Sequence, residues 1–240
     1  MARLLRLVIS GLPHHVIQRG HDRGPLVNDD EDRRMWQASL REAAAQHGVE
    51  VQAWALLDDR FHLVATPLAA NALSHMMQAL GRRFVGWFNR RHARSGTLWD
   101  GRFRAAALEP ERWVLPCMRH VELQPVHAGL AADAGGFAWS SAAHHLGALV
   151  DPLVSDPPAY WALGNTPFER CAVYRRFLDA GGSAGELEAI DAATRRGWPL
   201  GSPAYFEGFS PASPAALAPR PRGRPRKQLL TDTHSSGDDV

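Results

Sequence analysis

The stretch Ala53 to Val64, AWALLDDRFHLV, decides the fold prediction. Two apolar, β-prone runs, residues 51–57 and 61–66, flank the turn-like sequence Asp58-Asp59-Arg60. Apolar runs separated by a short polar turn are typical of a β-hairpin, so we expect the two runs to pair as antiparallel strands.

The chain alternates between predicted strands and helices on both sides of this hairpin. Residues 15–19 read as a strand, and a helix is expected over about residues 30–46, between an acidic start and Gly48. After the hairpin, the pattern predicts a helix over residues 73–92, a strand over 102–108 and a helix from Pro110 to about residue 123. This order predicts an α+β fold, an antiparallel sheet with helices packed on it.

The second half of the chain has a different composition. It becomes Pro-rich from Pro152, with predicted helices over residues 168–178 and 186–194, and after Pro211 it is rich in Pro, Ala and Arg. Such a tail buries too little apolar surface to fold alone. We therefore expect a folded domain over residues 1–148, a helical extension over 149–205 and a disordered tail over 206–240.

Composition and charge set wide bounds on function. The 240 residues are 45% hydrophobic and 22% charged, with a net charge of +2. Lys227 is the sole lysine, so 26 of the 27 basic residues are arginines, which suits phosphate binding but also follows from a GC-rich genome. The N-terminus lacks a signal-peptide pattern and no apolar run suits a membrane span, so we expect a cytoplasmic, nucleoid-associated protein. Cys117 and Cys171 form no metal-binding pair and are expected to be reduced.

Further motifs follow the hairpin in order: GTLWDGRFR at residues 96–104, VELQPVHAGL at 121–130 and FAWSS at 137–141. Together with AWALLDDRFHLV they resemble the REP-associated tyrosine transposases, relatives of the single-tyrosine HUH transposases. The resemblance covers about residues 1–148 and continues into WPLGS at 198–202 and the basic tail. It implies a ferredoxin-like or RRM-like sandwich that binds DNA, in a bacterial mobile-element protein.

The resemblance also implies a catalytic site. In that family, a His-hydrophobic-His pair on one strand and an amide on a helix hold a divalent Mg or Mn ion. A tyrosine four residues before the amide attacks the DNA phosphate and forms a 5′-phosphotyrosyl link.

The sequence departs from this pattern at two positions. The metal pair reads Arg60-Phe61-His62, and a guanidinium has no lone pair for a metal. The nucleophile position is His120, with Gln124 at the amide position. We therefore expect His62 and Gln124 to bind metal weakly or not at all. If metal binding is kept, Asp58 or Asp59 would supply a further ligand. We also expect that strand cleavage is lost.

Two alternatives to loss of activity stay open. A histidine can form a phosphoryl adduct, so His120 could act as an altered nucleophile, although a replaced surface residue is the simpler interpretation. The chain's tyrosines, Tyr160, Tyr174 and Tyr205, all lie outside the predicted sandwich, so rescue would need a distant segment or another subunit. The remaining histidines, such as the pair His14-His15, match no zinc spacing.

Two basic segments predict DNA contact. The first contains arginines interleaved with aromatic residues: Arg82, Arg83, Arg90, Arg91, Arg94, Arg102 and Arg104. A solvated face above an aromatic core is the alternative interpretation. The second is the tail sequence Arg222-Gly223-Arg224-Pro225, which looks like an AT-hook and predicts contact with A·T-rich minor grooves; a nonspecific basic tail is its alternative.

The sequence therefore predicts a transposase-like protein that binds hairpin or single-stranded DNA and has lost cleavage. One alternative is an active metal-dependent strand transferase with a changed nucleophile. Another is a domesticated DNA-binding regulator that acts through its tail. Relatives occur as monomers or dimers, so a homodimer is open.

Overall fold

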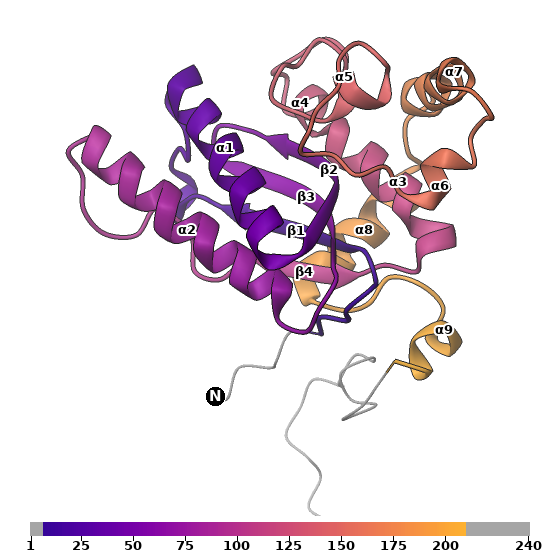
Figure 1. The fold of residues 1–240 in the computed structure, drawn as a ribbon, viewed down its shortest axis with the longest axis horizontal. Helices are drawn as coiled ribbons and strands as arrows, with labels where there is room; N and C mark the ends of the chain where they lie inside the picture. The colour runs from indigo at the N-terminus through magenta and orange to yellow at the C-terminus, as the bar shows by residue number, and fades with distance from the viewer. Residues whose placement is uncertain (1–6, 210–240) are drawn as a thin grey trace, which may run out of the picture.

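The computed structural model describes residues 7–209, and Figure 1 shows their fold. The strands are β1 (His14–Arg19), β2 (Val49–Leu56), β3 (Arg60–Pro67) and β4 (Arg104–Ala107). The longer helices are α1 (Asp30–His47), α2 (Ala72–Arg91), α3 (Pro110–Glu122), α7 (Pro167–Asp179) and α8 (Ala184–Arg196). The short helical segments are η1 (His21–Arg23), α4 (Gln124–His127), α5 (Ala142–His145), α6 (Pro158–Trp161) and α9 (Pro203–Glu207).

The four strands form one antiparallel sheet in the order β2-β3-β1-β4. The expected hairpin is present as β2 and β3, which continue the sheet through β1 to β4 at the far edge. The predicted α+β class, an antiparallel sheet with packed helices, is confirmed.

Helices α1 and α2 cover one face of the sheet (Figure 1). The Asp29 carboxylate caps α1 by accepting hydrogen bonds from the backbone N–H groups of Glu31 and Asp32, and Gly48 ends it in the left-handed conformation at φ 63°. Trp36 of α1 and Phe84 of α2 pack into the same core cluster as Leu63 of β3. This face therefore packs an apolar core against α1 and α2.

Helices α3 and α8 cover the opposite face. The second core cluster combines Val64 of β3, Val121 of α3, Tyr174 of α7 and Ile190 of α8. The extension therefore shares this core with the sheet, and Leu200 bridges to Leu108 beyond the end of β4. The division at residue 148 stays a prediction, as does the disorder of the tail, whose residues 210–240 lie outside the described part of the chain.

Candidate functional site

Two histidines from neighbouring strands meet under the second face of the sheet. Ile17 lies directly opposite His62 and His15 opposite Val64, so the alternation of side chains puts both histidines on the face that α3 and α8 cover. Their rings stack with centroids 5.4 Å apart, and His15 Nε2 lies 3.2 Å from His62 Nδ1.

The predicted residues of α3 and α4 join them. His120 lies edge-on to both rings, 5.4 Å from His15 and 6.0 Å from His62 between centroids. Gln124 comes four residues later, and its amide Nε2 lies 3.1 Å from His120 Nε2. His62, His120 and Gln124, predicted as one site, are thus brought together. His15 is the member that sequence reasoning missed, because its proximity depends on the pairing of β1 with β3.

Helix α8 closes this histidine cluster (His15, His62 and His120). Asp191 Oδ1 lies 3.4 Å from His120 Nε2, and Thr194 Oγ1 lies 2.7 Å from His15 Nδ1. All three histidines are buried, with 3% of His62 and 2% of His120 exposed. Burial lowers the pKa values of His15 and His62 well below the ordinary value, so both rings are neutral at pH 7.

Arg60 precedes His62 by two residues on β3 and faces the same side of the sheet. Its Nη1 donates to Asp59 Oδ1 at 2.9 Å, and its charge helps to lower the pKa of His62 after burial and the neighbouring histidines. A guanidinium offers no lone pair and repels a cation. The residues at the positions of the family's metal site therefore do not fit the Mg or Mn ion that the transposase resemblance implies.

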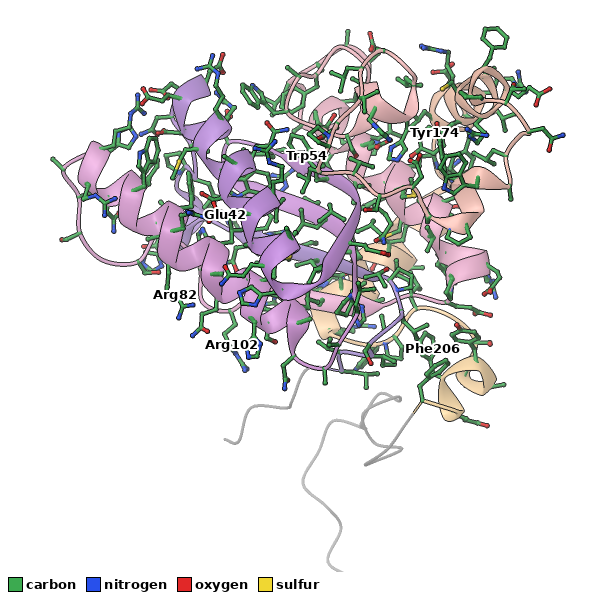
Figure 2. All side chains as sticks on the ribbon, in the orientation of Figure 1. Glu42, Trp54, Arg82, Arg102, Tyr174 and Phe206 are labelled. Atoms are coloured by element: carbon green, nitrogen blue, oxygen red, sulfur yellow. The ribbon has the colours of Figure 1, made fainter. Side chains whose placement is uncertain are left out.

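The tyrosines have other partners. The Tyr174 hydroxyl donates to Glu122 Oε2 at 2.8 Å, the Tyr160 hydroxyl donates to the backbone oxygen of His145, and Tyr205 lies in α9. No hydrogen bond or ring contact within residues 7–209 joins a tyrosine to His15, His62 or His120. In Figure 2, Tyr174 lies among α3, α5 and α7, on the opposite side of the molecule from Arg82 and Arg102.

Tyr174 belongs to a second polar cluster around a buried carboxylate. Glu122 accepts hydrogen bonds from Ser141 Oγ at 2.5 Å, His145 Nδ1 at 2.6 Å and the Tyr174 hydroxyl. Burial by itself lowers the pKa of His145. The carboxylates of Glu122 and Asp156 outweigh this effect and raise the pKa to about 9. His145 is therefore an imidazolium at neutral pH.

A metal ion does not fit beside His145. Asp156 Oδ1 lies 3.2 Å from His144 Nε2 and 3.5 Å from His145 Nε2. His144 Nδ1 accepts the backbone N–H of Asp151, which leaves the proton of a neutral His144 ring on Nε2. Neither ring nitrogen that faces Asp156 then has a free lone pair for a cation. The cluster is therefore a structural ion-pair network that joins α5 to Glu122 of α3 and to Asp156 of the extension.

A basic cleft of about 360 Å³ lies beside the histidine cluster, between the β1–β4 edge and α8. Ile17, opposite His62, and Thr194, bonded to His15, are among its lining residues. The exposed arginines that line it are Arg19, Arg102, Arg104, Arg195 and Arg196, and Asp100 is the acidic lining residue. Arg19 and Arg102 make no side-chain hydrogen bond or ion pair with other residues of the described range 7–209. Sequence reasoning named Arg102 and Arg104 but missed the other three.

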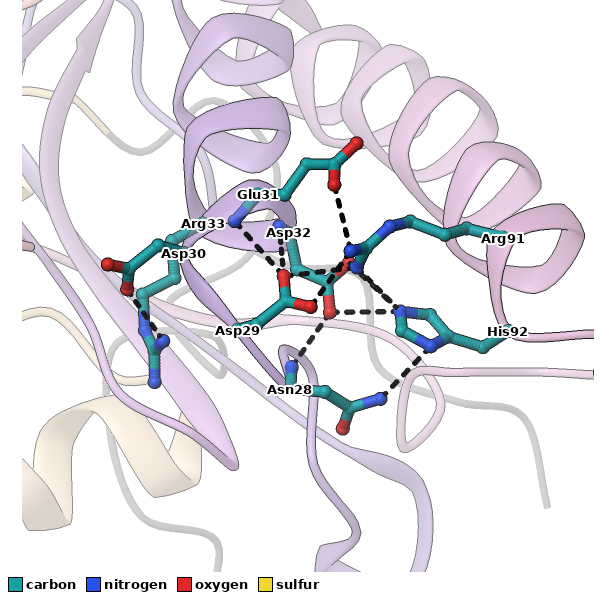
Figure 3. A network of polar contacts seen from close by, with 8 residues as sticks. All are labelled: Asn28, Asp29, Asp30, Glu31, Asp32, Arg33, Arg91 and His92. Carbon is teal, nitrogen blue, oxygen red and sulfur yellow. Dashed lines mark hydrogen bonds and ion pairs between the residues drawn. The ribbon is translucent and has the colours of Figure 1, made fainter.

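The predicted arginines of α2 are placed differently. Arg91 pairs with Asp29 at 2.8 Å, Glu31 at 2.9 Å and the buried Asp32 at 2.5 Å, so it ties α2 to the start of α1 (Figure 3). Arg83 forms an ion pair with Glu42. Arg82 and Arg90 are exposed on the same helix, whereas Arg222, Gly223, Arg224 and Pro225 lie outside the described residues.

No helix within residues 7–209 has the length and apolar character to span a membrane.

Residues 8–113 match the model of the IS200-like transposase family. No curated protein matches the chain significantly.

Two solved structures are similar. A REP-associated tyrosine transposase bound to a REP hairpin matches 66% of this chain and 93% of its own, at 15% identity and a TM-score of 0.53. A crystal structure described as a transposase from Deinococcus radiodurans matches 54% of this chain and 98% of its own, at 22% identity and a TM-score of 0.34. The first similarity bears out the fold.

Proposed function

We propose that this protein binds single-stranded or hairpin DNA of the repeated-palindrome type and does not cut it. The proposal rests on the sequence: Arg60 and His120 occupy the positions to which the resemblance assigns a metal-binding histidine and the nucleophilic tyrosine. The first change removes a metal ligand and adds a positive charge, and the second removes the phenol that would carry the DNA 5′ end.

The surroundings of His120 also argue against a histidine nucleophile. Its Nε2 contacts Gln124 and Asp191, and 2% of the residue is exposed under α8. A nucleophile needs its reacting atom close to the scissile phosphorus. A DNA phosphate could reach this ring only after α8 had moved.

The basic cleft supports DNA binding without catalysis. Arg19 and Arg102 are exposed and unpaired within residues 7–209, so their guanidinium groups are available to backbone phosphates. Arg195 and Arg196 of α8 add positive charge on the other side of the cleft, and Arg196 stacks 4.8 Å from the ring centroid of Trp198. A strip of arginines beside an aromatic ring suits a single strand. The protein would bind this DNA on the nucleoid in the bacterial cytoplasm.

Binding is tested by fluorescence anisotropy with a labelled palindromic hairpin and a single-stranded oligonucleotide. Arg19→Gln/Arg102→Gln should weaken binding of the full-length protein and flatten its log–log salt dependence by roughly 1–2, since each lost phosphate contact removes about one unit. Arg83→Gln is the matched control, because that guanidinium pairs with Glu42. Equal affinities for the double variant and wild type would refute the cleft as the DNA site.

The tail offers a second contact, with Arg222, Gly223, Arg224 and Pro225 as an AT-hook-like core. Removal of residues 212–240 should lower affinity for A·T-rich duplex and leave substantial hairpin binding. Loss of all DNA binding in this truncated protein would instead favour a regulator that acts through its tail.

A further inference from the structure

The three rings of the histidine cluster converge closely enough that they could hold one metal ion. One ring nitrogen from each of His15, His62 and His120 lies within 4.8 Å of the other two. Two ligands about 2.05 Å from a tetrahedral zinc ion lie roughly 3.3 Å apart. The 3.2 Å between His15 Nε2 and His62 Nδ1 agrees with this separation.

Hydrogen bonds orient lone pairs toward the middle of the cluster. The Thr194 hydroxyl donates to the backbone oxygen of Ile190, so it accepts the proton of His15 Nδ1 and leaves His15 Nε2 bare. Asp191 Oδ1 lies 3.4 Å from His120 Nε2, a contact that favours the ring proton on Nε2 and thus a bare His120 Nδ1. The amide orientation that suits this proton position presents the Gln124 oxygen to His120 Nε2 and gives up the bond that Gln124 Nε2 donates to the His120 backbone oxygen.

The ring nitrogen His120 Nδ1 is buried without a hydrogen-bond partner among the described residues. Buried polar atoms normally have partners, and this nitrogen beside two further histidine rings needs an explanation. A carboxylate and a hydroxyl that hold the outer nitrogens of ligating histidines are the usual second layer of a metal site. Asp191 and Thr194 supply that layer from one face of α8.

We propose that His15, His62 and His120 bind one zinc-class transition metal ion, a ligand set different from the one that the family uses. Imidazole nitrogens favour zinc, cobalt or nickel, whereas Mg²⁺ requires oxygen ligands. Arg19 and Arg60 oppose any cation here, so strong metal–nitrogen bonds must hold it. The ion would join β1, β3 and α3 beneath α8. This proposal does not rest on DNA binding.

The test is titration of metal-free, full-length protein with Co²⁺ and Zn²⁺, followed by visible absorption and by metal analysis after gel filtration. We expect one ion per chain and the absorption band of tetrahedral cobalt. His15→Asn and His120→Asn should lose stoichiometric binding. His75→Ala, on the exposed surface of α2, is the matched control and should bind as wild type does.

The histidine variants change buried residues and could misfold, so Asp191→Asn is a second test of the site. Because 48% of the Asp191 side chain is exposed, this substitution should leave the fold intact. This variant should bind the metal roughly 10- to 100-fold more weakly, as loss of a second-layer partner does. Thermal unfolding in chelator should show all variants folded. Absence of stoichiometric binding by wild type, or binding unchanged in both histidine variants, would overturn the proposal.

Discussion

Glu122→Gln should destabilise the protein more than its small change in shape suggests. The carboxylate is completely buried and accepts hydrogen bonds from Ser141, His145 and Tyr174. Removal of one partner of a buried ion pair costs about 3–5 kcal/mol. His145 can release its proton in the variant, so we expect the low end, about 3 kcal/mol.

The pH dependence of stability gives a second signature of the same pair. Because the pKa of His145 is raised to about 9 from 6.5, its contribution is fully present below pH 6.5 and is lost as the pH rises through 9. A shift of this size corresponds to about 3 kcal/mol. The variant should therefore show a flatter fall of stability between pH 6.5 and 10 than wild type.

Urea denaturation measures both effects, with Glu188→Gln as a matched control. Glu188 is 71% exposed and pairs loosely with Arg195 at 3.4 Å, so its loss should change the free energy of unfolding by less than about 0.5 kcal/mol. A Glu122→Gln effect below about 1 kcal/mol at pH 6, with an unchanged pH profile, would refute the imidazolium–carboxylate assignment.

Three further outcomes are expected. Gly81→Ala should cost about 1–3 kcal/mol in thermal unfolding, because a Cβ there would lie 2.8 Å from Trp99 Cζ3, whereas Gly185→Ala, which meets no atom within 4 Å, should not. Trp54→Phe should cost about 1–3 kcal/mol in urea denaturation beyond its lost packing, since it leaves the buried Asp151 without the indole donor at 2.8 Å. Hairpin affinity should fall with salt at a log–log slope of roughly −3 to −5 if about five arginines contact phosphates, and a flat response would exclude those contacts.

Local patterns were enough to predict much of the fold. The hairpin of β2 and β3 follows from two apolar runs around a polar turn, and α2 and α3 follow from their apolar spacing. His120 and Gln124 are four residues apart on consecutive helical segments, so their contact was also predictable.

Contacts between distant segments were beyond sequence reasoning. His15 reaches His62 only because β1 inserts between β3 and β4, and its other partner, Thr194, is 179 residues away. For a related reason, the charge pattern did not show which arginines are available for DNA and which are paired within the protein. Arg91 looked available for DNA, but acidic residues at the start of α1 lie against it, and a sequence does not state which partner an arginine meets.

Loss of strand cleavage is tested most directly by covalent-adduct formation on a labelled hairpin with Mg²⁺ or Mn²⁺, comparing wild type with Arg60→His/His120→Tyr. We predict no nicking and no adduct for wild type, and a gain of both in the double variant. Nicking by wild type that disappears in His120→Ala would contradict it.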